Sequence, residues 1–401
     1  MNIRGYVEVG EQVRFGFLSE GDTPIGSTHY QRYHELVDQV IAAERFGWDI
    51  FGCSEQHLAI GGASTSAPEV LYSYMMALTS RIKFSFAVAL MPSRINHPIR
   101  TAERIATLDI LSHGRMEAVF GRGNTMLALR AFEVDSETNK AEMEEGIDLI
   151  VSAFLNDPFN FVGEFYKVPP RSLIPKPITT PHPPLAVAAT SVASSATAGA
   201  KGLGLVSFAN FSGFEVLNES LNAYDEAWAA GNHSEDKHKF KSVLISGLIC
   251  EESAEDARKK FVPLLEYVKL AVGAYDRLAD TSADYSYTKT IKKHVDSHIE
   301  DADYMMDDSA SFVVGDPEGC IKQIRKFEEL GVQQLWLRLD SMPHAKIIET
   351  LERFGRYVIP HFKNPKSVVK DPDDVLQSIR ERRAGHAIEL EAFLAKKDSK
   401  P

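Results

Sequence analysis

Three groups of polar residues stand directly after predicted β-strands, where they could take part in chemistry. The first, Glu55-Gln56-His57, follows a strand predicted over residues 49–54 and offers a carboxylate, an amide and an imidazole. An imidazole in such a place can act as a general base or donate a hydrogen bond to an oxyanion. A histidine in an ordinary surface loop is the competing interpretation.

The other two groups carry residue types that suit a phosphate. Gly121-Arg122-Gly123-Asn124 follows a strand predicted over residues 115–120. Its glycines let a ligand approach the backbone, and its guanidinium can bind a phosphate through paired hydrogen bonds. In residues 188–195 a predicted strand passes into a helix through four hydroxyl residues, and the free N–H groups of a helix N-terminus also favour an anion. An ordinary turn and an ordinary helix cap are the alternatives. Together the three groups indicate an anionic, phosphate-bearing cofactor beside one imidazole.

Other kinds of chemistry have little support in the sequence. The 13 histidines are scattered, and neither H-x-H, H-E-x-x-H nor a cluster of carboxylates occurs, so no metal site is predicted. A G-x-S-x-G nucleophile motif is also absent. The three cysteines, Cys53, Cys250 and Cys320, are far apart and form no C-x-x-C pair, which predicts small buried apolar residues rather than a disulfide framework.

A common framework has to position the three groups. Short β-branched or aromatic runs alternate with helical segments, which predicts a parallel sheet built from βα units. The expected fold class is α/β, a (β/α)₈ TIM barrel with insertions and a C-terminal helical tail. Because the active site of such a barrel lies at the carboxyl ends of its strands, the three groups should meet there. The strands are expected over residues 14–18, 49–54, 82–91, 115–120, 185–189, 203–207, 241–250 and 332–339.

Helix signals separate these strands. A capping box is expected at Ser66-Ala67-Pro68-Glu69, with Ser66 as the cap and Glu69 closing the box. Asp316 is expected to cap a helix that begins at Pro317 and ends before Gly331. Further helices are predicted over residues 30–46, 97–112, 191–201 and 344–358.

Two segments interrupt the alternation. Residues 159–168, with Gly163 in the middle, predict a hairpin inserted between barrel units. The long, charged and weakly periodic stretch from about 251 to 311 predicts a helix over residues 255–278, followed to about residue 308 by an insertion or mobile lid. The expected organisation is one barrel domain over residues 1–365, with this insertion, and a charged helical tail over residues 366–401.

The bulk composition limits the partners. The 401 residues, 44% hydrophobic and 25% charged, can form a large core. A net charge of −12 without a long Lys/Arg-rich run argues against nucleic acid and against an anionic membrane surface. Since neither a signal peptide nor an apolar run of about 18 residues occurs, the protein is expected in the cytoplasm.

Several of these motifs occur in a spacing that resembles the bacterial luciferase-like flavin monooxygenases. The most specific stretch is His97-Pro98-Ile99-Arg100, then E-R-I-A-T-L-D-I-L-S-H-G-R over residues 103–115, ending in Gly121-Arg122-Gly123. A second, weaker match is Gly315-Asp316-Pro317-Glu318, a helix, Gly331 and V-Q-Q-L-W-L. The resemblance extends over most of residues 12–360.

This resemblance implies a two-component monooxygenase, usually a homodimer, that takes FMNH₂ from a separate NAD(P)H-dependent flavin reductase. The reduced flavin reacts with O₂, and one oxygen atom enters a small organic substrate via a peroxyflavin. Ala87-Val88 matches the place where the family often has a non-proline cis peptide under the isoalloxazine ring. The residues implied to bind the FMN phosphate are Arg122, Asn124, Thr190, Ser191 and Ser194.

One position departs from the luciferases. There, two consecutive histidines follow the glutamate and the first is assigned to catalysis, whereas this chain has Gln56 at that position. Glutamine cannot take up a proton at neutral pH, so His57 becomes the candidate catalytic residue and light emission from aldehydes is not expected. In the loop of residues 92–96, Arg94 is a candidate to receive an anionic substrate.

The leading hypothesis is therefore an FMNH₂-dependent monooxygenase acting on a small organic molecule. A deazaflavin-dependent dehydrogenase on the same barrel is one alternative, because related enzymes share much of the phosphate-site pattern and such an enzyme needs no oxygen. A non-catalytic flavin-binding protein is the other, and Gln56 keeps that alternative open.

Overall fold

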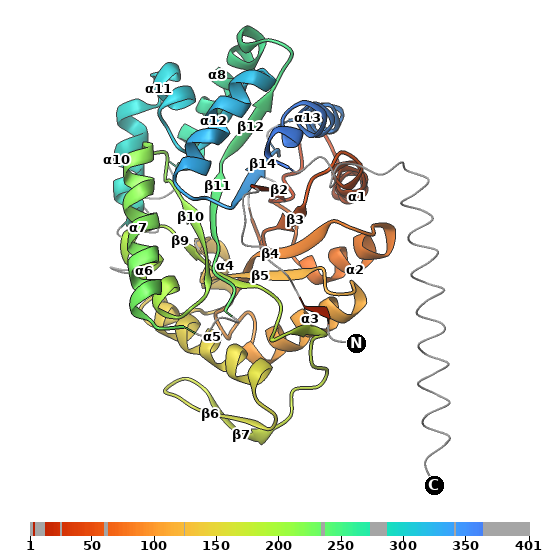
Figure 1. The fold of residues 1–401 in the computed structure, drawn as a ribbon, viewed down its shortest axis with the longest axis vertical. Coiled ribbons are helices and arrows are strands. Elements are labelled where there is room, and N and C mark those ends of the chain that lie inside the picture. Colours follow the sequence, from red (N-terminus) through yellow and green to blue (C-terminus); the bar gives the residue numbers. More distant parts are fainter. Residues whose placement is uncertain are drawn as a thin grey trace.

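Eight parallel strands close into a barrel in the computed structural model, and helices surround it (Figure 1). The order around the barrel is β10-β11-β14-β2-β3-β4-β5-β9, so the predicted (β/α)₈ barrel is confirmed. The structure describes residues 3–4, 13–24, 26–59, 63–123, 125–233, 237–272, 287–340 and 342–363. The barrel strands are β2 (Arg14–Ser19), β3 (Ile50–Cys53), β4 (Lys83–Leu90), β5 (Met116–Gly121), β9 (Leu185–Ala189), β10 (Gly204–Phe208), β11 (Lys241–Ile245) and β14 (Gln334–Arg338).

The helices that follow these strands cover the outside of the barrel (Figure 1). Within the described ranges, no helix is long and apolar enough to cross a membrane. The surrounding helices are α1 (His29–Arg45), α2 (Pro68–Leu78), α3 (Pro98–Leu111), α4 (Met126–Ala131), α5 (Asn139–Leu155), α6 (Val192–Ala200), α7 (Phe214–Ala230), α12 (Pro317–Glu329) and α13 (His344–Tyr357), followed by the 3₁₀ turn η2 (Ile359–Phe362).

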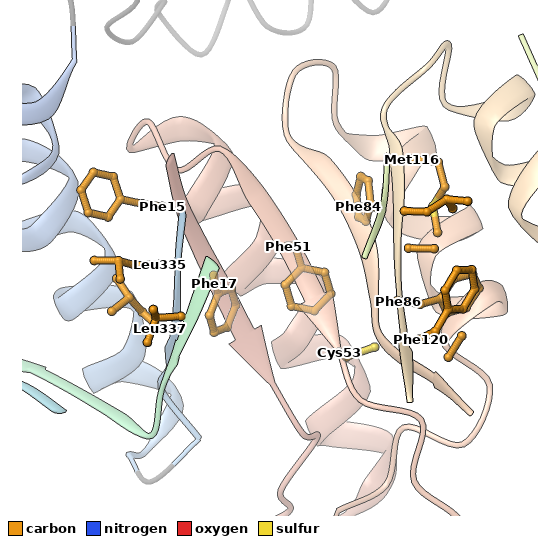
Figure 2. Packing of buried hydrophobic residues seen from close by; sticks show 14 of the residues in the cluster. Phe15, Phe17, Phe51, Cys53, Phe84, Phe86, Met116, Phe120, Leu335 and Leu337 are labelled. Atoms are coloured by element: carbon orange, nitrogen blue, oxygen red, sulfur yellow. The ribbon is translucent and has the colours of Figure 1, made fainter. Parts of the chain in front are cut away.

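The main apolar core lies between the strands and these helices (Figure 2). Alternate strand residues face outward into it, as the two-residue period of a strand requires. Phe15 and Phe17 of β2 belong to this core, and the Phe15 ring lies 5.4 Å from that of Phe354 on α13. The three cysteines are buried, as predicted.

Trp336 of β14 fills part of the barrel interior. It is 2% exposed and packs with Leu18 and Ile50 in a separate small cluster. A Cβ placed on Gly16 or Gly52 would lie 2.6 or 2.9 Å from atoms of its ring. These two neighbouring strands therefore need glycine at this level, because any side chain would displace the indole.

The strand predicted over residues 241–250 is in fact two strands, and the prediction of one was wrong. β11 stays in the barrel, whereas β12 (Gly247–Cys250) pairs with β13 (Phe312–Gly315) in a separate two-stranded parallel sheet. The break falls at Ser246, whose N–H donates to the carbonyl of Ser311 at 2.7 Å. Beyond Ile245 the chain pairs with β13 instead of its barrel neighbours.

The predicted hairpin is confirmed. β6 (Phe159–Val162) and β7 (Lys167–Arg171) are antiparallel, and the carboxylate of Glu145 on α5 accepts the N–H groups of Glu164, Phe165 and Tyr166 at 2.8 to 2.9 Å. A further small sheet pairs β1 (Ile3–Arg4) with β8 (Thr179–Thr180).

The helix predicted over residues 255–278 is present as α8 (Ala254–Val272), as far as these residues are described. The segment predicted after it as an insertion or mobile lid contains α10 (Tyr287–His298) and α11 (Ala302–Asp307). The three helices share a second apolar cluster with β12 and β13, to which Ala257, Phe261, Leu265 and Val268 of α8 contribute at helical spacing. Residues 273–286 and the predicted tail over residues 366–401 lie outside the described residues.

The two predicted helix starts differ in outcome. Asp316 caps α12 by accepting the N–H of Gly319 at 2.8 Å, and Gly331 has a φ of +72° just past its end, as predicted. The prediction of a capping box at Ser66 was wrong. The N-cap of α2 is Ala67 without a side-chain hydrogen bond, and Glu69 lies 3.1 Å from Arg104 of α3 instead.

Candidate active site

Three adjoining pockets lie at the carboxyl ends of the barrel strands. The mouth pocket, with a volume of about 240 Å³, is lined by Ala87, Val88, Trp336 and mainly other apolar residues. The imidazole pocket contains Glu55, Gln56 and His57 and shares Glu20, Ala87 and Val88 with the mouth pocket. The hydroxyl pocket contains Arg122 and Ser191 and shares Ala188 and Thr190 with the mouth pocket. The three groups identified in the sequence therefore meet around one hollow.

The hydroxyl pocket combines cations with hydroxyl groups. Arg122, Lys140 and Lys201 line it against one carboxylate, Glu144, although Lys201 also pairs with Asp148 at 2.7 Å. The predicted residues Thr190, Ser191 and Ser194 line the same pocket. Such a set suits a dianionic group, because both charge and hydrogen-bond donors point to one place.

Ser191 and Ser194 form the start of α6. The Ser191 hydroxyl accepts the N–H of Ser194 at 3.3 Å, and the Ser194 hydroxyl accepts the N–H of Ser191 at 3.1 Å. The sequence interpretation as an ordinary cap is thus partly right, since these hydroxyls cap the helix. The capped turn holds them at the pocket wall together with the positive end of the helix dipole.

A buried carboxylate fixes the imidazole. Glu55 is 5% exposed and lies 3.1 Å from His57 Nε2. It also accepts the N–H of Leu90 at 3.0 Å and the side-chain N–H of Asn96 at 2.8 Å. With Nε2 donating to Glu55, His57 Nδ1 is the ring nitrogen that can accept a proton. Gln56 lies in the same pocket, and its Oε1 accepts from the Thr125 hydroxyl at 3.4 Å.

Ala87 and Val88, near the carboxyl end of β4, line both the imidazole pocket and the mouth pocket. Their peptide bond is cis, as the resemblance implied for this position. The pairing of β4 with β5 shifts register between Ala87 and Ala89. On the neighbouring strand β5, a Cβ on Gly121 would lie 2.6 Å from the Val88 side chain, so glycine is needed there.

A charged cluster borders the mouth pocket, and the sequence interpretation missed it. Arg338 lies 2.5 Å from Asp22, 3.7 Å from Glu20 and 3.5 Å from Asp340. Asp340, fully buried, pairs in turn with Arg32 at 2.7 Å. Burial, together with the charges of Asp340 and Glu20, raises the pKa of Asp22 to about 6 despite the neighbouring Arg338.

Trp336 was also missed as a site residue. Its strand reads as ordinary core in the sequence, but the indole lines the mouth pocket and its Nε1 is buried without a hydrogen-bond partner. The small residues Gly16 and Gly52 on neighbouring strands were the available signal, since they leave the space that the ring occupies.

Of the remaining predicted residues, one lies away from these pockets and one is not described. Arg94 is 67% exposed, lies 3.9 Å from Glu133 and lines none of the three pockets. Asn124 lies outside the described residues. In the described part of the chain, no group of three or more His, Cys, Asp or Glu residues could hold a metal ion.

Comparison with known protein sequences finds monooxygenases. A family model described as luciferase-like monooxygenase matches residues 13–334. Limonene 1,2-monooxygenase of Rhodococcus erythropolis is 26% identical over 348 residues, which is 82% of this chain and 81% of that protein. The FMNH(2)-dependent dimethylsulfone monooxygenase of Pseudomonas putida is 24% identical over 347 residues, or 82% of this chain and 87% of the relative.

Solved structures show the same fold with two kinds of flavin. The oxygenating constituent of 3,6-diketocamphane monooxygenase of Pseudomonas putida, in complex with FMN, aligns with a TM-score of 0.69 at 20% identity, covering 88% of this chain and 100% of that one. The coenzyme F420-dependent tetrahydromethanopterin reductase of Methanopyrus kandleri aligns with a TM-score of 0.65 at 17% identity, with the same coverage.

Proposed function

Because the chain belongs to the luciferase-like monooxygenase family, we propose that it is an FMNH₂-dependent, two-component monooxygenase acting on a small organic substrate. The observation that carries this proposal is the continuity of the three pockets. A polar, cationic end adjoins an apolar centre, which adjoins a buried Glu–His pair. This sequence of environments suits a ligand with a phosphate at one end and a planar ring at the other.

The residues present fit FMN. Arg122, Thr190, Ser191 and Ser194 would hold the phosphate in the hydroxyl pocket. The ring would lie in the mouth pocket against Ala87 and Val88, within reach of Trp336 Nε1, which is buried without a hydrogen-bond partner. When bound, the reduced flavin supplies the activation of O₂, and a separate NAD(P)H-dependent reductase supplies the reduced flavin.

The protein's own residues bind the ligands, orient the reacting groups and exclude water from them. Phe211 and the α8 residues Leu264 and Val268 line the mouth pocket with apolar groups, which keep water from the reacting atoms. Glu55 holds His57 in one orientation, so that Nδ1 can accept a proton or, once protonated, donate a hydrogen bond to a developing oxyanion.

The direct test is reconstitution with FMN, a flavin reductase, NADH and O₂. We expect FMN to bind at micromolar concentration or tighter and oxygen to be incorporated into an organic substrate. No binding of oxidised or reduced FMN would contradict the proposal. Flavin binding without turnover over a broad substrate panel would favour the non-catalytic alternative.

A deazaflavin-dependent dehydrogenase is the second candidate, since the F420-dependent reductase has the same fold at a TM-score of 0.65. Parallel titrations with FMN and coenzyme F420 separate the two. Tighter binding of F420, and substrate oxidation without oxygen, would favour this candidate.

Replacing His57 with Gln should lower the turnover number about tenfold while leaving FMN affinity unchanged, as expected for the loss of one hydrogen bond worth about 1.4 kcal/mol. The reason is that His57 contacts Glu55 in the imidazole pocket, away from the hydroxyl pocket. His34→Gln on the exposed face of α1 is the matched control and should change neither quantity. Unchanged turnover in His57→Gln would remove His57 from the mechanism.

We also propose a homodimer formed through α2. Val70, Tyr74 and Leu78 recur every four residues on this helix and are 67%, 56% and 39% exposed, and Leu111 at the end of α3 is 57% exposed. Tyr74→Glu should shift the protein to monomer in light scattering after size exclusion, whereas Tyr30→Glu on α1 should not. A monomeric parent protein would contradict this prediction.

A further inference from the structure

The mouth pocket has few polar groups apart from one charged pair. Its walls come from barrel strands, including Phe208 at the end of β10, from Phe211 just after β10, and from Leu264, Val268 and Val272 of α8. The three α8 residues stand four apart and therefore share one face of the helix, which turns toward the barrel. A substrate that lies in this pocket beside the proposed flavin ring meets mainly carbon on the protein side.

The charged pair at its edge is Glu20 and Arg338. Arg338 is already engaged, because its Nη2 lies 2.5 Å from Asp22 Oδ2, its Nη1 3.7 Å from Glu20 Oε1, and its Nε 3.5 Å from Asp340 Oδ2. Asp340 also pairs with Arg32. The cluster thus contains three carboxylates and two guanidinium groups, an excess of one negative charge when all are ionised.

Resting on the proposed function, we infer that the organic substrate is uncharged and largely apolar, and that Glu20 and Asp22 exclude anions by occupying Arg338. The surroundings of Asp22 support this. Burial, with Asp340 and Glu20, raises the pKa of Asp22 to about 6 although Arg338 is in contact, so this place already resists a carboxylate. An anionic substrate would meet the same resistance and would find no spare cation in the cluster.

The test compares two ligands of nearly the same shape, cyclohexyl methyl ketone and cyclohexanecarboxylate, by calorimetric titration near neutral pH. The full chain is titrated with and without FMN. We expect the ketone to bind about tenfold or more tightly than the carboxylate, because placing a like charge beside a carboxylate costs free energy.

Variants test whether Glu20 and Asp22 cause this ligand preference. Glu20→Gln combined with Asp22→Asn should raise carboxylate affinity about tenfold and leave ketone affinity within about threefold, because it removes two of the three carboxylates around Arg338 and leaves only Asp340. Asp22→Asn alone, a change of nearly equal shape, should show part of the effect if the double variant folds poorly. Glu133→Gln, which removes the exposed partner of Arg94, is the control and should change neither affinity.

Several outcomes would overturn the inference. These are equal or tighter binding of the carboxylate to the parent protein, absence of ketone binding, or an unchanged preference in both variants. Loss of carboxylate binding in Arg94→Gln would also overturn it, because the anion would then be received outside this cluster. Failure to bind FMN would contradict the proposed function instead, since the ligand preference is measured without flavin as well.

Discussion

Replacing Arg122 with Ala should weaken FMN binding about 100-fold and leave riboflavin binding nearly unchanged. Arg122 lines the hydroxyl pocket with Thr190, Ser191 and Ser194, where the phosphate is proposed to lie. Hydrogen bonds to a charged group are worth about 1.5 to 3 kcal/mol, and about 2.7 kcal/mol corresponds to a factor of about 100. Because riboflavin lacks the phosphate, it should bind parent and variant alike.

Fluorescence titration of both flavins measures this difference. Arg122→Lys should recover only part of the affinity, because an ammonium group cannot form the paired hydrogen bonds of a guanidinium. Arg130→Ala is the matched control, since Arg130 lies on the exposed face of α4 and lines none of the three pockets. Equal losses for FMN and riboflavin would place Arg122 at the ring or in the fold, and no loss for either would remove it from the site.

The barrel was readable in the sequence because its signals are local. Each strand is a short, mainly apolar run, and Asp316, Pro317 and Gly331 mark the start and end of a helix by local chemistry alone. The split at Ser246 was not readable. Residues 241–250 read as one mainly apolar strand, and only the pairing of Gly247 with Phe312, 65 residues away, decides where the barrel strand ends.

The candidate site likewise contains residues whose position the sequence predicts and residues whose position it does not. The convergence of residues that directly follow strands, such as His57, Arg122 and Ser191, could be predicted because a barrel places strand ends together. Trp336 lies inside the last strand and Arg338 ends it, and both lie within the longer strand predicted over residues 332–339, where a residue's role depends on which neighbours face it across the barrel. The position of Arg94, which lines none of the three pockets, could not be predicted for a related reason, because a loop sequence does not show which way a side chain points. Its role in binding a substrate stays a prediction.

The largest expected effect on stability belongs to Glu117, at the opposite end of the barrel from the pockets. It is 3% exposed, and its Oε1 lies 2.7 Å from Arg14 and 3.1 Å from Lys83, the first residues of β2 and β4. Glu117→Gln should lower the free energy of unfolding at neutral pH by about 3 to 5 kcal/mol, because it leaves two partly buried cations without their shared anion. Urea denaturation followed by circular dichroism measures the loss.

Two further variants test the reason for this loss. Glu103→Gln, which breaks the exposed pair with Arg100, should cost less than about 1 kcal/mol. Replacing all three residues with apolar ones (Glu117→Leu, Arg14→Met and Lys83→Met) should recover most of the stability, because no buried charge is then left unpaired. A triple variant less stable than Glu117→Gln would show that the ion cluster itself, rather than the unpaired charge, is what the fold requires.

The ion cluster of Glu117, Arg14 and Lys83 also predicts how the stability difference between the parent protein and Glu117→Gln depends on pH. Burial alone would raise the pKa of Glu117, but attraction to Arg14 and Lys83 outweighs burial and lowers the pKa from 4.5 to about 2. A carboxyl whose pKa is lower in the folded than in the unfolded protein stabilises the fold above its unfolded pKa. That contribution is lost as the pH falls from about 4.5 through about 2. The stability difference between parent and Glu117→Gln should therefore be constant from neutral pH down to about 5 and shrink below it. A difference that stayed constant down to pH 3 would mean that Glu117 contributes through packing and not through its charge.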